Sequence, residues 1–144
     1  MSSTSYFSKP TPVKARILVV DDVIDNFLLV QVILEEEGYE VEFADNGREA
    51  LKMIESEPPN MVLLDMMMPD MDGFEVARRI RENPNYSSLP ILFVTAYDEL
   101  VSETKINSIA DGLIKKPIDF DELINRVQTV LVNTKKFEKS FSVR

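Results

Sequence analysis

The chain has 144 residues, a net charge of −9, and 44% apolar and 28% charged residues, so we expect one globular domain rather than a disordered or collagen-like chain. It contains no cysteine and no histidine, which excludes disulfides, thiolate zinc sites, Ser-His triads and a phosphohistidine carried by this chain. No apolar run approaches the about 18 residues of a membrane span and the polar start shows no secretory signal, so we expect a cytoplasmic protein with no membrane partner.

Charge is distributed unevenly along the chain. Residues 1–16 and 133–144 each carry a net charge of +3, so the body, 17–132, carries −15. An acidic body repels nucleic-acid phosphates, and we therefore expect no direct nucleic-acid partner. We interpret 1–15 as a flexible N-terminal leader, 16–132 as the domain and 133–144 as a basic C-terminal tail.

Short apolar runs alternate with helical patterns through the body of the chain. In chain order we expect a strand at 17–20, a helix at about 25–37, an edge strand at 39–43, a helix at about 48–56, a strand at 61–64, a helix at about 74–82, a strand at 91–94, a helix at about 98–109, a short strand at 113–114 and a helix at about 119–132. The continuous apolar runs are typical of strands buried on both faces. The alternation predicts an α/β fold with a doubly wound, five-stranded parallel sheet.

Polar side chains directly follow four of the predicted strands. Asp21 and Asp22 follow the first, Asp65 the third, Thr95 the fourth and Lys116 the fifth, one residue further along. Ligands of such sheets bind beyond the carboxyl ends of the strands, so we expect these side chains to meet at one edge. Crowded carboxylates suit Mg²⁺. A carboxylate can attack phosphorus to form an acyl phosphate, while Lys and Thr hold the phosphoryl oxygens.

Four stretches carry a resemblance to a known family. ILVVDD, LLDMMMPDMDGFE, FVTAY and KKP match the motifs of response-regulator receiver domains of two-component signalling, in the family's order and close to its spacing, over 16–132. The resemblance implies a flavodoxin-like (CheY-like) strand order, 2-1-3-4-5. It also implies a phosphoacceptor that promotes its own phosphorylation and dephosphorylation, rather than a turnover enzyme.

The same resemblance implies a role for each site residue. The residues concerned are the phosphoacceptor Asp65, the phosphoryl-binding Thr95 and Lys116, and the Mg²⁺ ligands Asp21, Asp22, Asp65 and the backbone carbonyl of Met67. The Lys116–Pro117 bond is expected to be cis. The implied donor is a sensor histidine kinase or a histidine phosphotransfer protein, and a switch between two conformations would signal to a downstream protein or a second copy of the chain.

Three features depart from the family pattern. Leu113 stands where receivers usually carry Tyr or Phe, so an aromatic flip at that position is not available. Ile109 stands where a Gly often closes the preceding helix, and the spacing from Thr95 to Lys116 is one residue shorter than usual. These departures leave open a pseudo-receiver, an interaction module that acts without phosphorylation. The complete set of polar site residues favours the phosphorylated receiver.

The first predicted helix has apolar residues on two faces. The expected core face consists of Leu29, Val30, Ile33 and Leu34. The expected outward stripe consists of Ile24, Leu28 and Val32. This stripe is either a contact for the phosphoryl donor or is covered by a tail aromatic residue (Tyr6, Phe7, Phe137 or Phe141).

Overall fold

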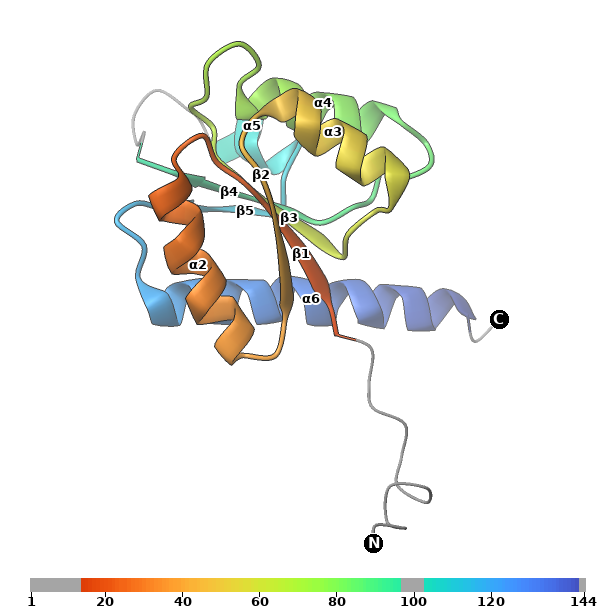
Figure 1. Ribbon diagram of the computed structural model, residues 1–144. Helices are drawn as coiled ribbons and strands as arrows, with labels where there is room; N and C mark the ends of the chain where they lie inside the picture. The colour runs from red at the N-terminus through yellow and green to blue at the C-terminus, as the bar shows by residue number, and fades with distance from the viewer. Residues whose placement is uncertain (1–13, 97–102, 143–144) are drawn as a thin grey trace, which may run out of the picture.

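The computed structural model describes residues 14–96 and 103–142, with side chains described through Thr134. Strands and helices alternate along the chain (Figure 1). The elements are β1 (Arg16–Val20), α2 (Ile24–Glu36), β2 (Glu40–Ala44), α3 (Gly47–Ser56), β3 (Met61–Leu64), α4 (Gly73–Glu82), β4 (Ile91–Thr95), α5 (Glu103–Asn107), β5 (Gly112–Lys115) and α6 (Phe120–Ser142). All strand pairs are parallel and the order is β2-β1-β3-β4-β5, which confirms the predicted topology and places β2 at an edge.

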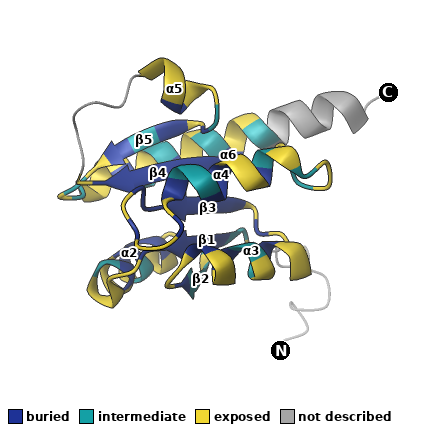
Figure 2. Cartoon of the chain, turned by 90° about the horizontal axis from the view of Figure 1, so that it is seen from above, coloured by how far each residue is buried: buried dark blue, intermediate teal, exposed yellow. Residues whose placement is uncertain are grey.

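The continuous apolar runs reflect a sheet that is covered on both faces. Along β1, Leu18 and Val20 pack into one hydrophobic cluster, and Ile17 and Val19 pack into the other. Helices α3, α4 and α5 complete the first cluster, and α2 and α6 complete the second (Figure 1). Strands β3 and β4 are therefore buried along their whole length, and β1 from Ile17 onward, as Figure 2 shows in dark blue. Successive side chains of such a strand point alternately into the two apolar layers, so none of its positions has to be polar.

Local signals set several helix boundaries. The side chains of Asn46 and Asp72 accept hydrogen bonds from the backbone N–H groups of Glu49 (2.8 Å) and Glu75 (2.9 Å), and thereby cap α3 and α4. Gly38 follows α2 with a φ of 92°, a conformation that glycine adopts without strain.

Two helices differ in length from the prediction. Helix α6 continues ten residues past Val132, to Ser142, because residues 133–142 contain no Gly or Pro to end it. Helix α5 ends at Asn107 rather than Ile109, and the predicted start at Asp98 lies outside the described residues. None of the described helices is both long enough and apolar enough to span a bilayer.

The apolar outer face of α2 is wider than predicted. Leu28 and Val32 are exposed as expected, but Leu29, predicted to be in the core, is 45% exposed. Phe27 takes the core position instead and stacks on Phe43, with ring centroids 4.3 Å apart. Phe27, Val30 and Leu34 are spaced three and four residues apart, so they form one buried row along α2. Leu29 lies beside that row rather than within it.

Candidate functional site

The sheet register brings the predicted site residues to one edge. Asp21, Asp65 and Lys116 each follow the last residue of a strand. The backbone N–H of Asp65 donates to Val20 O (2.9 Å), and that of Lys116 donates to Thr95 O (2.9 Å). These bonds continue the strand pairing by one residue, so the side chains emerge beyond the carboxyl ends of the strands. The Lys116–Pro117 bond is cis, as predicted.

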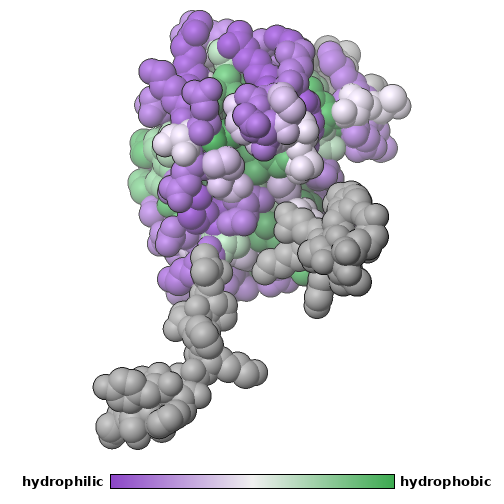
Figure 3. All heavy atoms as spheres, turned by 90° about the vertical axis from the view of Figure 1, so that its right-hand side faces the viewer, coloured by the Kyte–Doolittle hydropathy of each residue, from purple (hydrophilic) through white to green (hydrophobic). Residues whose placement is uncertain are grey.

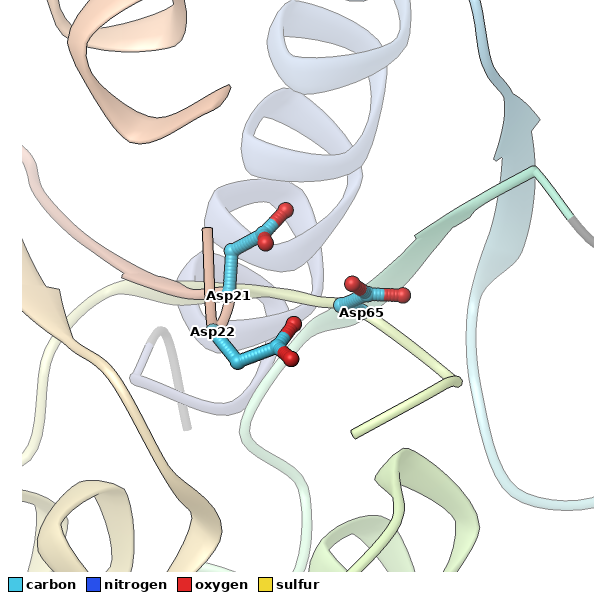
Figure 4. Close-up of side chains that lie close together, drawn as sticks. All are labelled: Asp21, Asp22 and Asp65. Atoms are coloured by element: carbon cyan, nitrogen blue, oxygen red, sulfur yellow. The ribbon is translucent and has the colours of Figure 1, made fainter. Parts of the chain in front are cut away.

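The acidic side chains converge around the Lys116 ammonium. Lys116 Nζ lies 3.0 Å from Asp21 Oδ2 and 3.4 Å from Asp65 Oδ2. Asp21 and Asp65 are buried, whereas Asp22 is exposed. One carboxylate oxygen from each of the three aspartates lies within 4.8 Å of the other two, and Figure 4 shows the three groups side by side. The predicted meeting of these residues is therefore confirmed.

The pKa of Asp65 is raised above its usual value. Burial is the largest cause, because it disfavours the ionised carboxyl, and the charge of Asp21 acts in the same direction. The backbone N–H of Met67, which donates to Asp65 Oδ1 at 3.0 Å, opposes the rise in pKa, as does Lys116. Asp65 is thus a carboxyl group held out of water by the fold, and two hydrogen-bond donors stabilise its ionised form.

This raised pKa predicts a pH-dependent effect of Asp65→Asn on stability. The folded protein holds a proton on Asp65 more tightly than the unfolded chain does, so its stabilising contribution is complete below the ordinary value of 3.8 and is lost as pH rises through the folded-state pKa. In chelator-treated protein, we expect Asp65→Asn to increase the unfolding free energy at neutral pH, and the increase to shrink as pH falls. Urea titrations of wild type and variant at several pH values from neutral to acid measure this difference in unfolding free energy.

The matched control for loss of one negative charge is Asp121→Asn, at an exposed position in the first turn of α6. A stability difference between wild type and Asp65→Asn that stays constant from neutral to acid pH would contradict the burial argument. So would a decrease in stability on substitution at neutral pH.

The donor set fits a hard divalent cation. The three carboxylates and one ammonium leave two negative charges in excess at the sheet edge. All the converging acceptors are oxygens, the ligand type that Mg²⁺ and Ca²⁺ prefer. Asp22, exposed beside its two buried neighbours, leaves one side of the cluster open to solvent. The described residues can therefore hold a metal ion at this position.

The structure places the other two predicted site residues next to this cluster. Thr95 is fully buried as the last residue of β4, in register with Lys115 of β5. Met67 lies two residues after Asp65, and its side chain is 57% exposed, in contrast to its buried neighbours Met66 and Met68. The backbone of Met67 contacts the cluster through its N–H, which donates to Asp65 Oδ1 at 3.0 Å.

Asn26 is a site residue that the sequence reasoning missed. Its Nδ2 lies 3.3 Å from Asp21 Oδ1 and 3.2 Å from Asp21 Oδ2. The backbone N–H of Val23 also donates to Asp21 Oδ1, at 2.9 Å. These donors orient the Asp21 carboxylate from the start of α2. The available signal was the position of Asn26 in the first turn after the Asp21-Asp22 pair.

Gly73 is a second residue that the sequence reasoning passed over. Its N–H donates to Met66 O at 3.0 Å. A Cβ atom at this position would overlap the carbonyl oxygen of Asp65 and lie 2.8 Å from Met66 Cα. The start of α4 therefore packs directly against the backbone of Asp65. The motif Asp72-Gly73 combines the helix cap with the residue that permits this close approach.

The departures from the family pattern lie on the side of β5 and α5. Leu113 of β5 is half-buried against the cluster formed with α3, α4 and α5. Arg81 reaches the chain segment after α5: its Nε donates to Ile109 O (2.9 Å), and its Nη1 donates to Leu89 O (2.7 Å). In this chain an arginine from α4, rather than a helix-ending glycine, fixes the end of α5.

Comparisons with known proteins agree with this geometry. The family profile described as "Response regulator receiver domain" matches residues 17–128. The chain is 38% identical to the transcriptional regulatory protein TrcR of Mycobacterium tuberculosis over 125 residues, and 40% identical to the response regulator PleD of Caulobacter vibrioides over 117 residues. These matches cover 86% and 81% of this chain, but only 48% and 26% of the relatives.

A solved structure gives the same result. The chemotaxis protein CheY4 of Vibrio cholerae superposes with a TM-score of 0.76 at 33% identity, covering 82% of this chain and 99% of that one. The chain thus spans about half of the length of TrcR and about a quarter of the length of PleD, but it matches nearly the whole of CheY4.

Proposed function

The chain belongs to the response regulator receiver family, and on that premise we propose that it accepts a phosphoryl group on Asp65 from a phosphohistidine of another protein. The observation that carries the proposal is the Lys116 ammonium, held between the buried carboxylates of Asp21 and Asp65 at the carboxyl edge of the sheet. A family match supports the chemistry, and this cluster supplies the nucleophile and charge that the chemistry requires.

In the proposed reaction, a carboxylate oxygen of Asp65 attacks the phosphorus of the donor. A P–O bond forms as the P–N bond of the phosphohistidine breaks, and the electron pair of that bond remains on the imidazole nitrogen. The Lys116 ammonium and the Thr95 hydroxyl would bind phosphoryl oxygens during the transfer. The 144 residues contain no histidine, so the donor histidine lies outside them, on a histidine kinase or a phosphotransfer protein.

We propose that Asp21, Asp22, Asp65 and the backbone carbonyl of Met67 hold Mg²⁺ at this site. When bound, the ion would neutralise the excess carboxylate charge and so favour the approach of an anionic phosphoryl group. Asn26 would keep the Asp21 carboxylate oriented for this role. The phosphoryl group would remain on Asp65 until water removes it, so the chain acts as a switch and not as a turnover enzyme.

Incubation with acetyl phosphate tests this function directly. We expect the intact mass to increase by one phosphoryl group per chain in the presence of Mg²⁺, and not after chelation. No mass increase with any phosphoryl donor would contradict the proposal and would favour an interaction module that works without phosphorylation.

We propose the exposed apolar face of α2 as the surface that meets the donor protein. Ile24, Leu28 and Val32 form a stripe along this helix, and Leu29 widens it. Met67, on the turn that carries Asp65, adds another exposed apolar side chain beside the site. A helical bundle that presents a phosphohistidine could bury this stripe and so bring the phosphorus to Asp65.

Leu28→Glu tests the contact surface. We expect phosphotransfer from the cognate phosphohistidine protein to slow by about tenfold, since burying a charge at a contact centre typically costs more than 1 kcal/mol. Phosphorylation by acetyl phosphate should be unchanged, because a small donor does not need α2. Rapid-quench transfer assays measure both rates.

Ser56→Glu is the matched control for an added negative charge, because Ser56 is exposed at the end of α3 on the other face of the sheet. If Leu28→Glu and Ser56→Glu transfer at the same rate, the α2 face is not the contact surface.

A further inference from the structure

The outer edge of β2 is a second surface, separate from the phosphorylation site. Strand β2 is an end strand of the sheet and pairs only with β1. The Glu40 N–H donates to Ala15 O at 2.9 Å. The Ala44 carbonyl accepts from the Asp21 N–H at 3.2 Å. Alternate residues of a strand direct their backbone groups to the same neighbour, so Glu40, Glu42 and Ala44 face β1.

The backbone groups of Val41 and Phe43 therefore point away from β1. Within the described part of the chain, no residue is bonded to these two N–H groups or these two carbonyls. The strand lies at the outside of the sheet between α2 and α3, and both views agree on this (Figure 1, Figure 2). Such an edge can accept one further strand through main-chain hydrogen bonds.

The two faces of β2 differ in character. Val41 and Phe43 are half-buried against the cluster that contains α2. Glu40 and Glu42 belong to the opposite face, because side chains alternate along a strand. On that side a hollow of about 390 Å³ lies between β2 and α3, and Glu42 lines it. A strand added at this edge would place alternate side chains beside the apolar pair and the others beside the glutamates.

The surroundings of β2 are strongly acidic. Residues 35–57 contain nine carboxylates and only two cations, a net charge of −7. The carboxylates are those of Glu35, Glu36, Glu37, Glu40, Glu42, Asp45, Glu49, Glu55 and Glu57, and all but Glu42 are exposed. The first three end α2, whose last turn has no basic residue, although the helix dipole disfavours negative charge there. Most of the side shown in Figure 3 is likewise hydrophilic (purple), with hydrophobic residues (green) between.

Arg16 neutralises only part of this charge. Its Nη2 pairs with Glu42 Oε1 at 2.9 Å, and its Nε and Nη1 lie 4.0 Å from Glu40 and 3.8 Å from Glu57. One cation among three carboxylates leaves two negative charges in excess, and the side chains of Glu40 and Glu57 stay 60% and 76% exposed. A second copy paired β2 to β2 would set glutamates against glutamates. The charge therefore favours a basic partner.

We propose that the outer edge of β2 binds an extended segment of another protein in which basic and apolar residues alternate. The main chain of the segment bonds to Val41 and Phe43. Its apolar side chains lie beside these two residues, and its lysines or arginines lie beside Glu40 and Glu42. The same alternation applies whether the segment runs parallel or antiparallel to β2.

Two peptides of equal composition test this inference on the full, unphosphorylated chain. Acetyl-Lys-Val-Lys-Val-Lys-amide has the alternating pattern, and acetyl-Lys-Lys-Lys-Val-Val-amide has the same charge without it. We expect the alternating peptide to bind about fivefold more tightly in NMR titrations, because two side chains of the other peptide fall on the wrong face. Equal affinities would mean that the acidic surface merely attracts cations, and would overturn the proposal.

Amide hydrogen exchange shows where the peptide binds. We expect a saturating concentration of the alternating peptide to slow exchange of the Val41 and Phe43 N–H groups at least about tenfold. The Glu42 N–H, which faces β1, is the internal control and should change far less. Unchanged exchange at Val41 and Phe43 would overturn the proposal. Protection of both groups in the protein without peptide would also overturn it, because a second copy or another part of this chain would then occupy the edge.

A charge reversal at the edge gives an independent check. Glu40→Lys should weaken binding of the alternating peptide about threefold more than Glu55→Lys does, as expected for the loss of one exposed pair. Glu55 is the matched control because it is exposed on α3 but does not line the hollow beside β2. Equal weakening by the two variants would overturn the contact with Glu40.

Discussion

Asp65→Asn should reduce incorporation of a phosphoryl group from acetyl phosphate by more than about a hundredfold, because the amide is not a nucleophile for phosphorus. The substitution conserves the shape of the side chain, and its single amide oxygen can still accept from the Met67 N–H, which contacts Oδ1 in the wild type, while the Lys116 ammonium keeps the Asp21 carboxylate as a partner. The fold should therefore persist while the chemistry is lost. Wild type and variant are each incubated with acetyl phosphate and Mg²⁺, and intact mass spectrometry measures the fraction of each that gains a phosphoryl group.

Asp70→Asn is the matched control. Asp70 lies five residues after Asp65 in the same connection between β3 and α4, and its exposed side chain is not part of the acidic cluster. We expect this variant to be phosphorylated to the same extent as wild type. Equal phosphorylation of the Asp65 variant would mean that another residue is the acceptor, and the proposed function of Asp65 would be wrong.

Gly73→Ala should destabilise the protein by about 1–3 kcal/mol, the range expected for forced overlap in a packed region. The added methyl group would collide with the carbonyl oxygen of Asp65, and backbone atoms cannot move aside as a flexible side chain can. This expectation opposes helix propensity, which favours Ala over Gly in a helix by about 1 kcal/mol. Urea unfolding monitored by circular dichroism measures the change.

Gly112→Ala provides the contrast. A Cβ at Gly112 would overlap the guanidinium of Arg126, which is the far end of a flexible side chain and can swing away, and would lie 3.2 Å from Leu92 Cδ2, which would have to shift only slightly. We expect a loss of stability below about 1 kcal/mol there. If the two alanine variants unfold at the same urea concentration, the contact between Gly73 and the Asp65 backbone does not constrain the fold as described.

The fold could be predicted because its strongest signals are local. The inner strands are buried on both faces, so each one stands out in the sequence as an unbroken apolar run, and each run stops where the chain leaves the sheet. The site could be predicted for the same reason. Asp21 and Asp65 are the first polar residues after two such runs, and parallel pairing brings neighbouring strand ends together.

Other features depend on tertiary contacts that the sequence does not display. Leu29 and Phe27 are both plausible core residues of α2, and only the stacking of Phe27 on Phe43 decides between them. Asn26 gains its role from the position of the Asp21 carboxylate. The constraint on Gly73 arises from a backbone that passes close by, and a glycine after a capping aspartate gives no indication of such a neighbour.

The length of α6 has a mechanical consequence. The helix is anchored in the hydrophobic core by Leu123, Val127 and Leu131, and it continues eleven residues past the last of these to Ser142. At about 1.5 Å per residue, that projecting part measures about 16 Å. A tilt of about 10° at the anchored end would move the tip by about 3 Å, so a small rotation of α6 would be most noticeable at Ser142.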